Sequence, residues 1–185
     1  MGSNAAEKFQ EFENKSPQEI LEWALKTYPK IALASSFGAE DVVVIDMMMK
    51  INPKARVFTL DTGRLNPETS DVMDRVREKY SLALEVMFPN TEATEKMVRA
   101  KGMNLFYDSI ENRKECCGVR KVEPLNRALK ALDAWITGLR RQQSVTRTTM
   151  RAIEVDEAHH NMVKVNPLIN WTSEQVWAYI KKNGV

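Results

Sequence analysis

The 185-residue sequence predicts an α/β fold, a mostly parallel twisted sheet with helices on both faces. Two observations support this class. Short apolar segments typical of buried strands alternate along the chain with segments of helical periodicity, which is the pattern of βα units. Hydrophobic residues make up 43% of the chain, enough for one domain with a core. Because the sequence shows no internal repeat and no linker, we expect residues 1–185 to form a single domain.

The first half of the chain predicts a helix followed by three strand–helix units. Ser16 and Glu19 can form a capping box around Pro17, and Tyr28-Pro29 ends that helix. The predicted strands are 30–34, 56–60 and 82–87, and the predicted helices after them are 39–50, 67–80 and 91–100.

The second half is less regular. Residues 101–112 have weak periodicity and receive no assignment, and a helix is expected over 123–132 next to Pro124. A strand over 134–137 leads into an arginine-rich polar loop, 139–149. The last predicted elements are strands 151–155 and 162–165 and a helix that starts at Thr172 and closes near Gly184.

Three polar segments follow predicted strands: 35–41, 61–64 and 138–147. Ligands of parallel sheets bind beyond the carboxyl ends of the strands, so we expect these segments on one rim. Residues 35–41 hold two serines and a glycine ahead of a helix, a pattern that suits phosphate or sulfate but also an ordinary turn. The arginines of 138–147 match anion oxygens as bidentate donors, although a solvated charged loop is the alternative.

Two further features leave alternatives open. Asp61 could bind a ribose hydroxyl or could cap the turn that follows it. Cys116 and Cys117, the two cysteines of the chain, are a metal or redox candidate, or a buried pair. The basic residues after them would favour thiolates.

Charge and hydropathy argue against nucleic-acid-binding, membrane and secreted proteins. A net charge of +2 does not favour nucleic acid or a membrane surface as partner, and no apolar run reaches the length of a membrane span. The first eight residues are polar and lack the apolar core of a secretion signal, so a cytoplasmic location is expected.

Taken together, these motifs resemble the phosphosulfate reductases of sulfate assimilation and cysteine biosynthesis, and among them the iron–sulfur adenylyl-sulfate (APS) reductase branch. The resemblance covers the chain from about Ile31 to its end. It rests on five ordered motifs: Ser-Ser-Phe-Gly-Ala-Glu-Asp at 35–41, Leu-Asp-Thr-Gly-Arg at 60–64, Cys-Cys-x-x-Arg-Lys-x-x-Pro-Leu at 116–125, Gly-Leu-Arg-Arg-x-Gln-Ser at 138–144 and Lys-Val-Asn-Pro-Leu-Ile-x-Trp-Thr at 164–172.

The resemblance implies an adenine-nucleotide α-hydrolase-like fold and an oxidoreductase that converts APS to sulfite and AMP. A cysteine thiolate would attack the sulfur, and thioredoxin or glutaredoxin would then free sulfite. Cys116 and Cys117 would be two of four ligands of a [4Fe–4S] cluster, with Lys121 near both cluster and substrate. The implied substrate-binding residues are Ser35, Ser36, Phe37 and Gly38 at the phosphosulfate, Leu60, Asp61, Gly63 and Arg64 on the adenosine side, Lys121, and Arg140, Arg141, Gln143, Ser144 and Arg147 around the anion.

The sequence departs from this family in one respect. The remaining cluster ligands and the nucleophilic cysteine are expected beyond Val185, so we expect no catalytic residue in this chain, a truncated C-terminus and an inactive polypeptide that binds nucleotide weakly. A 3′-phosphoadenylyl-sulfate (PAPS) reductase is the alternative within the class, against which the cysteine pair argues. A binding-only nucleotide module and an ATP pyrophosphatase-type ligase are alternatives from other classes, and a homo-oligomer remains open.

Overall fold

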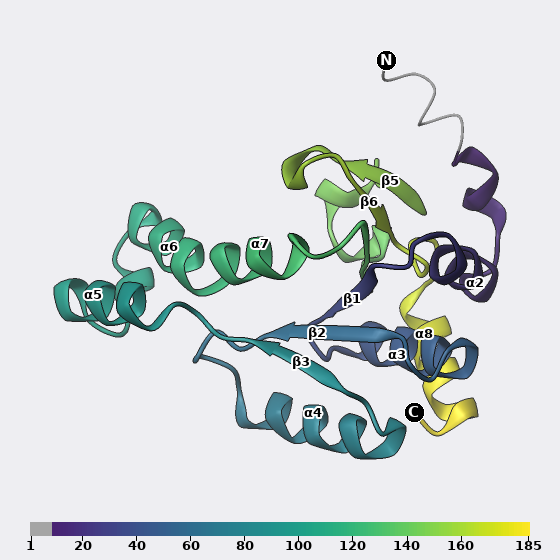
Figure 1. The fold of residues 1–185 in the computed structure, drawn as a ribbon, viewed down its shortest axis with the longest axis horizontal. Coiled ribbons are helices and arrows are strands. Elements are labelled where there is room, and N and C mark those ends of the chain that lie inside the picture. Colours follow the sequence, from purple (N-terminus) through teal and green to yellow (C-terminus); the bar gives the residue numbers. More distant parts are fainter. Residues whose placement is uncertain (1–8) are drawn as a thin grey trace.

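The computed structural model describes residues 9–185, so the polar residues 1–8, used above to argue against a secretion signal, lie outside the described part. A six-stranded sheet with strand order β3-β2-β1-β4-β6-β5 forms the centre of the fold (Figure 1). All neighbouring strands are parallel except β5, which runs antiparallel to β6. The strands are β1 (Ile31–Ser35), β2 (Arg56–Leu60), β3 (Leu84–Met87), β4 (Ala134–Ile136), β5 (Ile153–Asp156) and β6 (Met162–Val165). The predicted fold class is confirmed.

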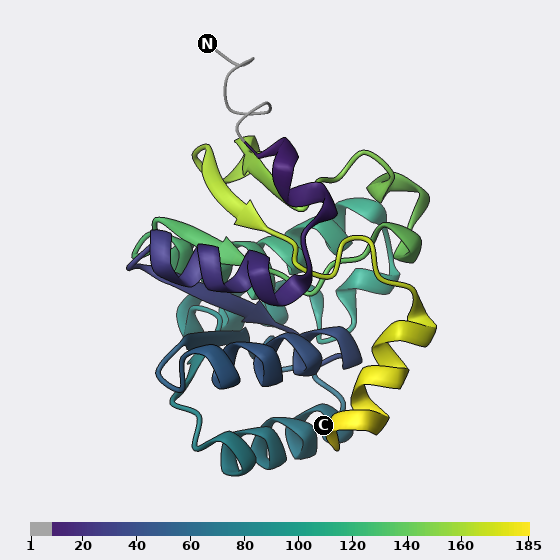
Figure 2. The ribbon, with the colours of Figure 1, turned by 90° about the vertical axis from the view of Figure 1, so that its right-hand side faces the viewer.

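Helices cover both faces of this sheet. Four of them, α2 (Pro17–Thr27), α3 (Ala39–Ile51), α4 (Pro67–Tyr80) and α8 (Ser173–Asn183), contribute to the core on one face. Figure 2 shows α8 beside α3 and α4. The helix α7 (Glu123–Leu129) packs on the other face. No helix within residues 9–185 is long and apolar enough to cross a bilayer.

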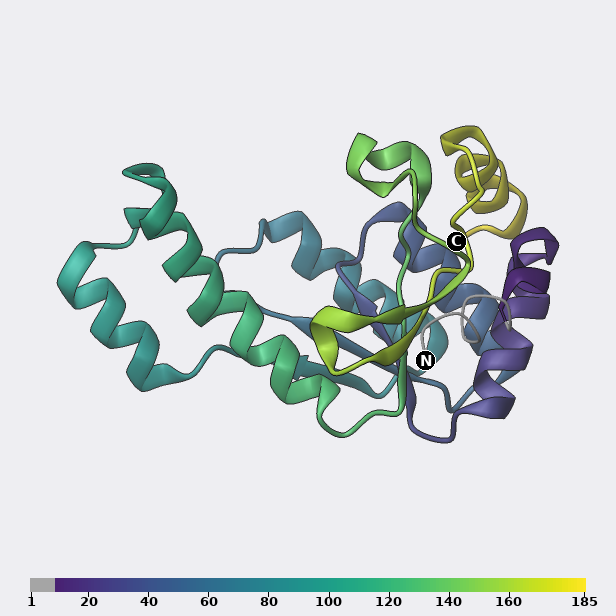
Figure 3. The ribbon, with the colours of Figure 1, turned by 90° about the horizontal axis from the view of Figure 1, so that it is seen from above.

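An arm extends beyond the carboxyl ends of the strands. It consists of α5 (Thr91–Lys101), the short turn η2 (Leu105–Tyr107) and α6 (Ile110–Cys117). Figures 1 and 3 show this arm reaching away from the sheet while α7 returns along the sheet. The arm therefore places α6, which carries the cysteine pair, near the edge at which ligands bind.

Side chains alternate between the two faces because the strand period is two residues. Leu33 and Ile136, which are register partners in β1 and β4, belong to the core under α2 and α3. Phe58 and Trp135 belong to the core under α7. Burial on both faces explains why the strands appear in the sequence as nearly continuous apolar runs.

Helix starts follow the predicted local signals. Ser16 and Glu19 form the capping box of α2, and Thr172 and Gln175 form that of α8. The predicted bounds of α4, β2 and β6 match the observed ones, and those of the other strands differ by one or two residues at one or both ends.

The prediction for residues 101–132 was wrong in one respect. A helix was expected from residue 123 only, whereas α6 starts at Ile110 and continues through a π-helical turn, Gly118–Val122, into α7. The turn lies directly before Pro124, which has no N–H to donate and whose ring crowds the carbonyl four residues earlier. The Glu123 N–H donates to Gly118 O, five residues back, so the helix widens instead of breaking.

Asp46 joins three helices on the α3 face. Its buried carboxylate accepts hydrogen bonds from Lys50 Nζ (2.6 Å), Tyr179 Oη of α8 (2.7 Å) and Tyr80 Oη of α4 (2.9 Å). Burial opposes the charge of Asp46, but these hydrogen bonds outweigh it and lower the pKa of Asp46. Burial raises the pKa of Tyr80 and of Tyr179, and the hydrogen bonds to the Asp46 carboxylate raise both further.

We expect Asp46→Asn to lower the free energy of unfolding at neutral pH by about 1–3 kcal/mol, because a charged acceptor of three hydrogen bonds is lost. A carboxyl with a lowered folded-state pKa stabilises the fold above its unfolded pKa, and this contribution disappears as the pH falls. In urea unfolding between pH 7 and pH 3, the free energy of unfolding should therefore change less with pH for Asp46→Asn than for the wild type. Asp71→Asn, an exposed change on α4, is the control; equal profiles for all three proteins would contradict the assignment.

Candidate functional site

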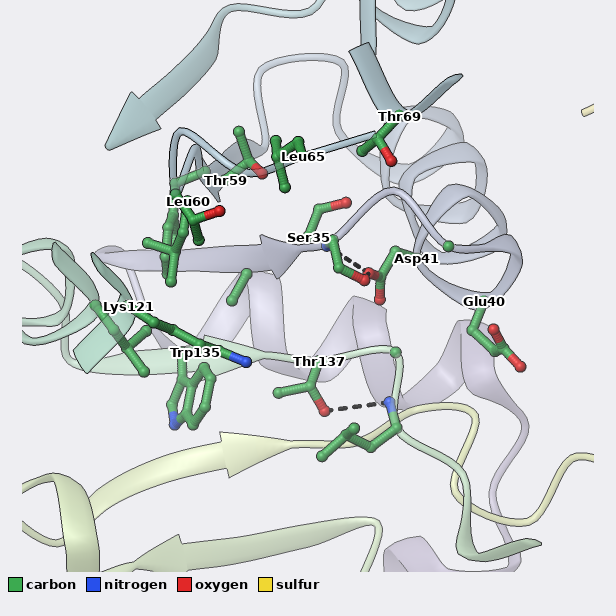
Figure 4. A pocket seen from close by; sticks show the side chains of 18 of the residues that line it. Ser35, Glu40, Asp41, Thr59, Leu60, Leu65, Thr69, Lys121, Trp135 and Thr137 are labelled. Atoms are coloured by element: carbon green, nitrogen blue, oxygen red, sulfur yellow. Dashed lines mark hydrogen bonds between the residues drawn. The ribbon is translucent and has the colours of Figure 1, made fainter. Parts of the chain in front are cut away.

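A cavity of about 710 Å³ lies at the carboxyl edge of the sheet. Strand β1 has β2 on one side and β4 on the other, so the chain order reverses at β1, the position where parallel sheets open a crevice. All three polar segments predicted to share a rim contribute to this cavity. Figure 4 shows Leu65 and Thr69 along one side of it and Trp135 and Thr137 along the other.

The loop after β1 is shaped by its own side chains. Ser36 donates from N (2.6 Å) and from Oγ (2.7 Å) to Asp41 Oδ2, and Phe37 N donates to Ser35 Oγ (3.1 Å). Gly38 is the N-cap of α3 and has no side chain to accept from the first helical amides. The positive end of the helix dipole thus faces this loop without a capping side chain.

Gly138 brings the end of β4 against this loop. Leu33 of β1 pairs with Ile136 of β4, so Ser35 and Gly138 follow at the same level. A Cβ atom on Gly138 would lie 2.1 Å from Asp41 Oδ1, which real structures do not tolerate. Burial raises the pKa of Asp41, and hydrogen bonds from Ser36 and Gly138 offset this only in part.

Arg140 forms a buried ion pair instead of facing the cavity. Its Nε and Nη2 donate to Glu40 Oε1 at 2.9 and 2.7 Å, and its Nη1 donates to Trp171 O at 3.3 Å. Burial opposes ionisation of Glu40, but the hydrogen bonds and charge of Arg140 outweigh it and lower the pKa of Glu40.

Arg141 is also engaged elsewhere. Its Nη2 donates to Glu13 Oε2 (2.6 Å) and its Nε to Met150 O (2.8 Å), and Nη1 contacts Asn170 Oδ1. The cationic side chains that line the cavity are Lys121 and Arg147. Arg147 Nη1 contacts Gln143 Oε1, whereas Lys121 is exposed and forms no ion pair within residues 9–185.

The turn after β2 is closed by Asp61, whose Oδ1 accepts from Gly63 N at 2.8 Å. Gly63 has φ 67°, a conformation that favours glycine. Arg120, 7% exposed, donates from Nη1 to Thr62 O at 2.7 Å and so fixes the turn to the π-helical turn. Arg64 points to the arm, where Nη2 donates to Asn104 Oδ1 (2.8 Å).

The structure thus divides the predicted binding residues into two groups. Those that line the cavity are Ser35, Ser36, Gly38, Leu60, Lys121, Gln143 and Arg147. Those that do not line it are Phe37, Asp61, Gly63, Arg64, Arg140, Arg141 and Ser144. Their roles in binding stay predictions.

Sequence reasoning missed several lining residues: Thr62, Leu65, Thr69, Leu125, Trp135 and Thr137. Two of these had a usable signal. Residues 135 and 137 share a face of the predicted strand 134–137 by period-two alternation, and Thr137 is the polar residue at its end. Thr62 and Leu125 lie within the motifs at 60–64 and 116–125, whereas Leu65 and Thr69 come from a loop and a helix, where no comparable signal exists.

The cysteine pair lies at the end of α6. Cys116 is buried against Met97 and Leu105, and Cys117 is exposed. Within residues 9–185, no group of three or more His, Cys, Asp or Glu side chains gathers as a metal site. The two thiols suit iron or zinc by chemistry but supply only half of a four-ligand set.

The sequence comparisons with known proteins agree on one family. Residues 30–185 match the family model described as "Phosphoadenosine phosphosulfate reductase domain". Proteins named adenosine 5′-phosphosulfate reductase are 46% identical over 154 residues in Burkholderia cepacia (83% of this chain, 61% of that one) and 45% identical over 173 residues in Pseudomonas aeruginosa strain LESB58 (91% and 64%). This chain therefore spans less than two thirds of the length of these relatives.

A solved structure is also similar. It is the crystal structure of phosphoadenylyl-sulfate (PAPS) reductase from Candida auris in a phosphate complex, with a TM-score of 0.85 and 31% sequence identity. The alignment covers 100% of this chain and 88% of that one.

We expect Gly138→Ala to lower the free energy of unfolding by about 1–3 kcal/mol, because the new Cβ would displace the Asp41 carboxylate. Gly118→Ala is the matched control: this glycine is helical and a Cβ there meets nothing within 4 Å. It should leave stability unchanged or raise it by about 0.5–1 kcal/mol. Denaturant unfolding measures the free energy of unfolding of both variants. Equal losses of stability in the two would contradict the close approach of Gly138 to Asp41.

Proposed function

The chain belongs to the phosphoadenosine phosphosulfate reductase domain family, and we propose that it is the nucleotide-binding part of an APS reductase of assimilatory sulfate reduction. The observation that carries this proposal is the cavity between β1 and β4. It joins the uncapped start of α3, the hydroxyl of Ser35, and the cations Lys121 and Arg147. Backbone amides, hydroxyls and cations are the groups that bind phosphate and sulfate oxygens.

The proposed orientation follows from the two sides of the cavity. The phosphosulfate would lie against the 35–38 loop, where the helix dipole favours negative charge. The adenosine would lie toward Leu60, Leu125 and Trp135, which supply apolar surface on the α7 side. Lys121 lies on the helix that borders this side and would reach the sulfate or the phosphate.

The proposed reaction needs a thiolate nucleophile. The thiolate would attack the sulfur of APS, forming an S–S bond while the S–O bond breaks and AMP leaves with the electron pair. Thioredoxin or glutaredoxin, a dithiol, would then release sulfite, regenerate the thiol and become a disulfide. The cavity lining described here contains no cysteine, so its residues would bind and orient APS.

Binding of APS to the 185-residue chain, measured by calorimetry, tests the proposal. Lys121→Ala should weaken binding about tenfold or more, since a hydrogen bond to a charged group is lost. Lys130→Ala, an equally exposed lysine that does not line the cavity, should leave the affinity within twofold. Equal losses of affinity in the two variants, or no binding of APS by the wild type, would contradict the assignment of the cavity as the APS site.

The same measurement separates the two substrates. APS is the proposed ligand because the relatives at 45–46% identity are named for it, whereas the similar solved structure is a PAPS reductase. The cavity lining carries two cations, Lys121 and Arg147, besides the acidic Glu40 and Asp41. A further 3′-phosphate would add charge that this lining does not balance. Tighter binding of PAPS than of APS would favour the alternative.

We further propose that Cys116 and Cys117 supply two thiolate ligands to a [4Fe–4S] cluster. Their adjacency at the end of α6 supports this proposal, because it brings two sulfur ligands together. The other two ligands would have to come from outside these 185 residues, which contain no other cysteine. Such a cluster would supply redox-active iron and sulfide. A cytoplasmic location suits such a cluster and stays a prediction from the sequence.

We expect the 185-residue chain, reconstituted anaerobically with iron and sulfide, to retain iron below four atoms per chain. Cys117→Ser should reduce the retained iron further, while Ser109→Ala, a change at the start of the same helix, should not. Iron and acid-labile sulfide assays measure this. Equal iron in wild type and Cys117→Ser would exclude Cys117 as a ligand.

A further inference from the structure

Phe37 combines two features that rarely occur together. It is a bulky aromatic residue, yet its φ of 59° lies in the left-handed region that disfavours side chains. It also stands between Ser36 and Gly38, both of which line the cavity. A surrounding structure has to hold such a conformation in place.

The Phe37 side chain points away from the cavity lined by its neighbours. It is 6% exposed and belongs to the core cluster beneath α3. It forms part of a second, separate groove of about 790 Å³ between α3, α4 and α8. This groove is lined mainly by apolar residues: Phe37, Ala39, Val42, Val72, Val76, Trp177, Ile180 and Val185.

The backbone of Phe37 connects two residues that line the cavity, Ser36 and Gly38. Its N–H donates to Ser35 Oγ at 3.1 Å, and the two peptide units around it connect Ser36 to the start of α3. Asp41 holds Ser36, but Gly38 has no side chain with which to fix the other end of the loop. The buried ring is therefore the anchor in the middle of the loop.

We propose that Phe37 is a positioning residue for the anion loop: its ring, fixed in the groove between α3, α4 and α8, sets the backbone that presents Ser36 and the first amides of α3 to the cavity. Glycine would adopt the same φ without strain but would leave the loop unanchored. The packing of α8 thereby supports the loop, because Trp177 and Ile180 of α8 line the groove that holds the ring.

The proposal rests on the proposed function only for its ligand, APS; the conformation of the loop can be measured without any ligand. Amide hydrogen exchange of Ser36 and Phe37, followed by NMR in the full 185-residue chain, reports the loop directly. Calorimetric titration with APS reports its effect on binding.

We expect Phe37→Gly to speed exchange of the Ser36 and Phe37 amides by about tenfold or more relative to amides of β1, and to weaken APS binding by a similar factor. Phe37→Leu keeps a large apolar side chain in the groove. Its amide exchange rates and its affinity for APS should therefore lie within about threefold of the wild-type values. Val76→Ala, a buried change on the α4 wall of the same groove, should lower the melting temperature without changing either quantity.

Wild-type exchange and affinity in Phe37→Gly would overturn the proposal, because the backbone conformation would then suffice without the ring. An equal loss of affinity in Val76→Ala would also overturn it. If Phe37→Gly does not fold, Phe37→Ala takes its place with the same thresholds. If the wild type binds no APS, the proposed function fails, while the exchange rates still decide whether Phe37 anchors the loop.

Discussion

The carboxylate of Asp41 is the contact on which the rest of the site depends. It accepts two hydrogen bonds from Ser36 and so closes the loop after β1, and it also lies against Gly138 at the end of β4. One side chain thus joins the two strands between which the sheet opens. Because any Cβ on Gly138 would collide with Asp41, the end of β4 approaches the first turn of α3 more closely than a side chain would allow. The cavity is defined by this approach, with the 35–38 loop on one side and the 138–147 segment on the other.

The sequence predicts those parts of the fold whose signals are local. Capping boxes at Ser16 and Thr172 mark helix starts, and strands buried on both faces appear as apolar runs. The helix Ile110–Cys117 was missed because its sequence is mostly polar and the apolar contacts that stabilise it are tertiary, chiefly Cys116 against Met97 and Leu105. Its continuation through a π-helical turn depends on Pro124, which in the sequence alone indicates a helix start.

In the candidate site, too, the sequence predicts what depends on local signals and topology but not what depends on tertiary contacts. Topology predicts that residues 35–41, 61–64 and 138–147 meet, because parallel strands end at one edge. It does not predict which way a side chain points. Arg140 and Arg141 fit an anion clamp by composition, yet their guanidinium groups bind Glu40 and Glu13, which lie 100 and 128 residues earlier in the chain. Partners so distant leave no pattern in a single sequence.

These ion pairs bear on anion binding in an indirect way. The first turn of α3 carries Glu40 and Asp41, whose charges suit the helix dipole but would repel an anion at the same place. Arg140 cancels the charge of Glu40, and burial opposes the charge of Asp41 by raising its pKa. With Glu40 paired, the two cations Lys121 and Arg147 exceed the remaining acid of the lining, Asp41. Arg140 therefore serves an anion better as the partner of Glu40 than as a direct ligand, since without it a carboxylate would face the bound charge at close range.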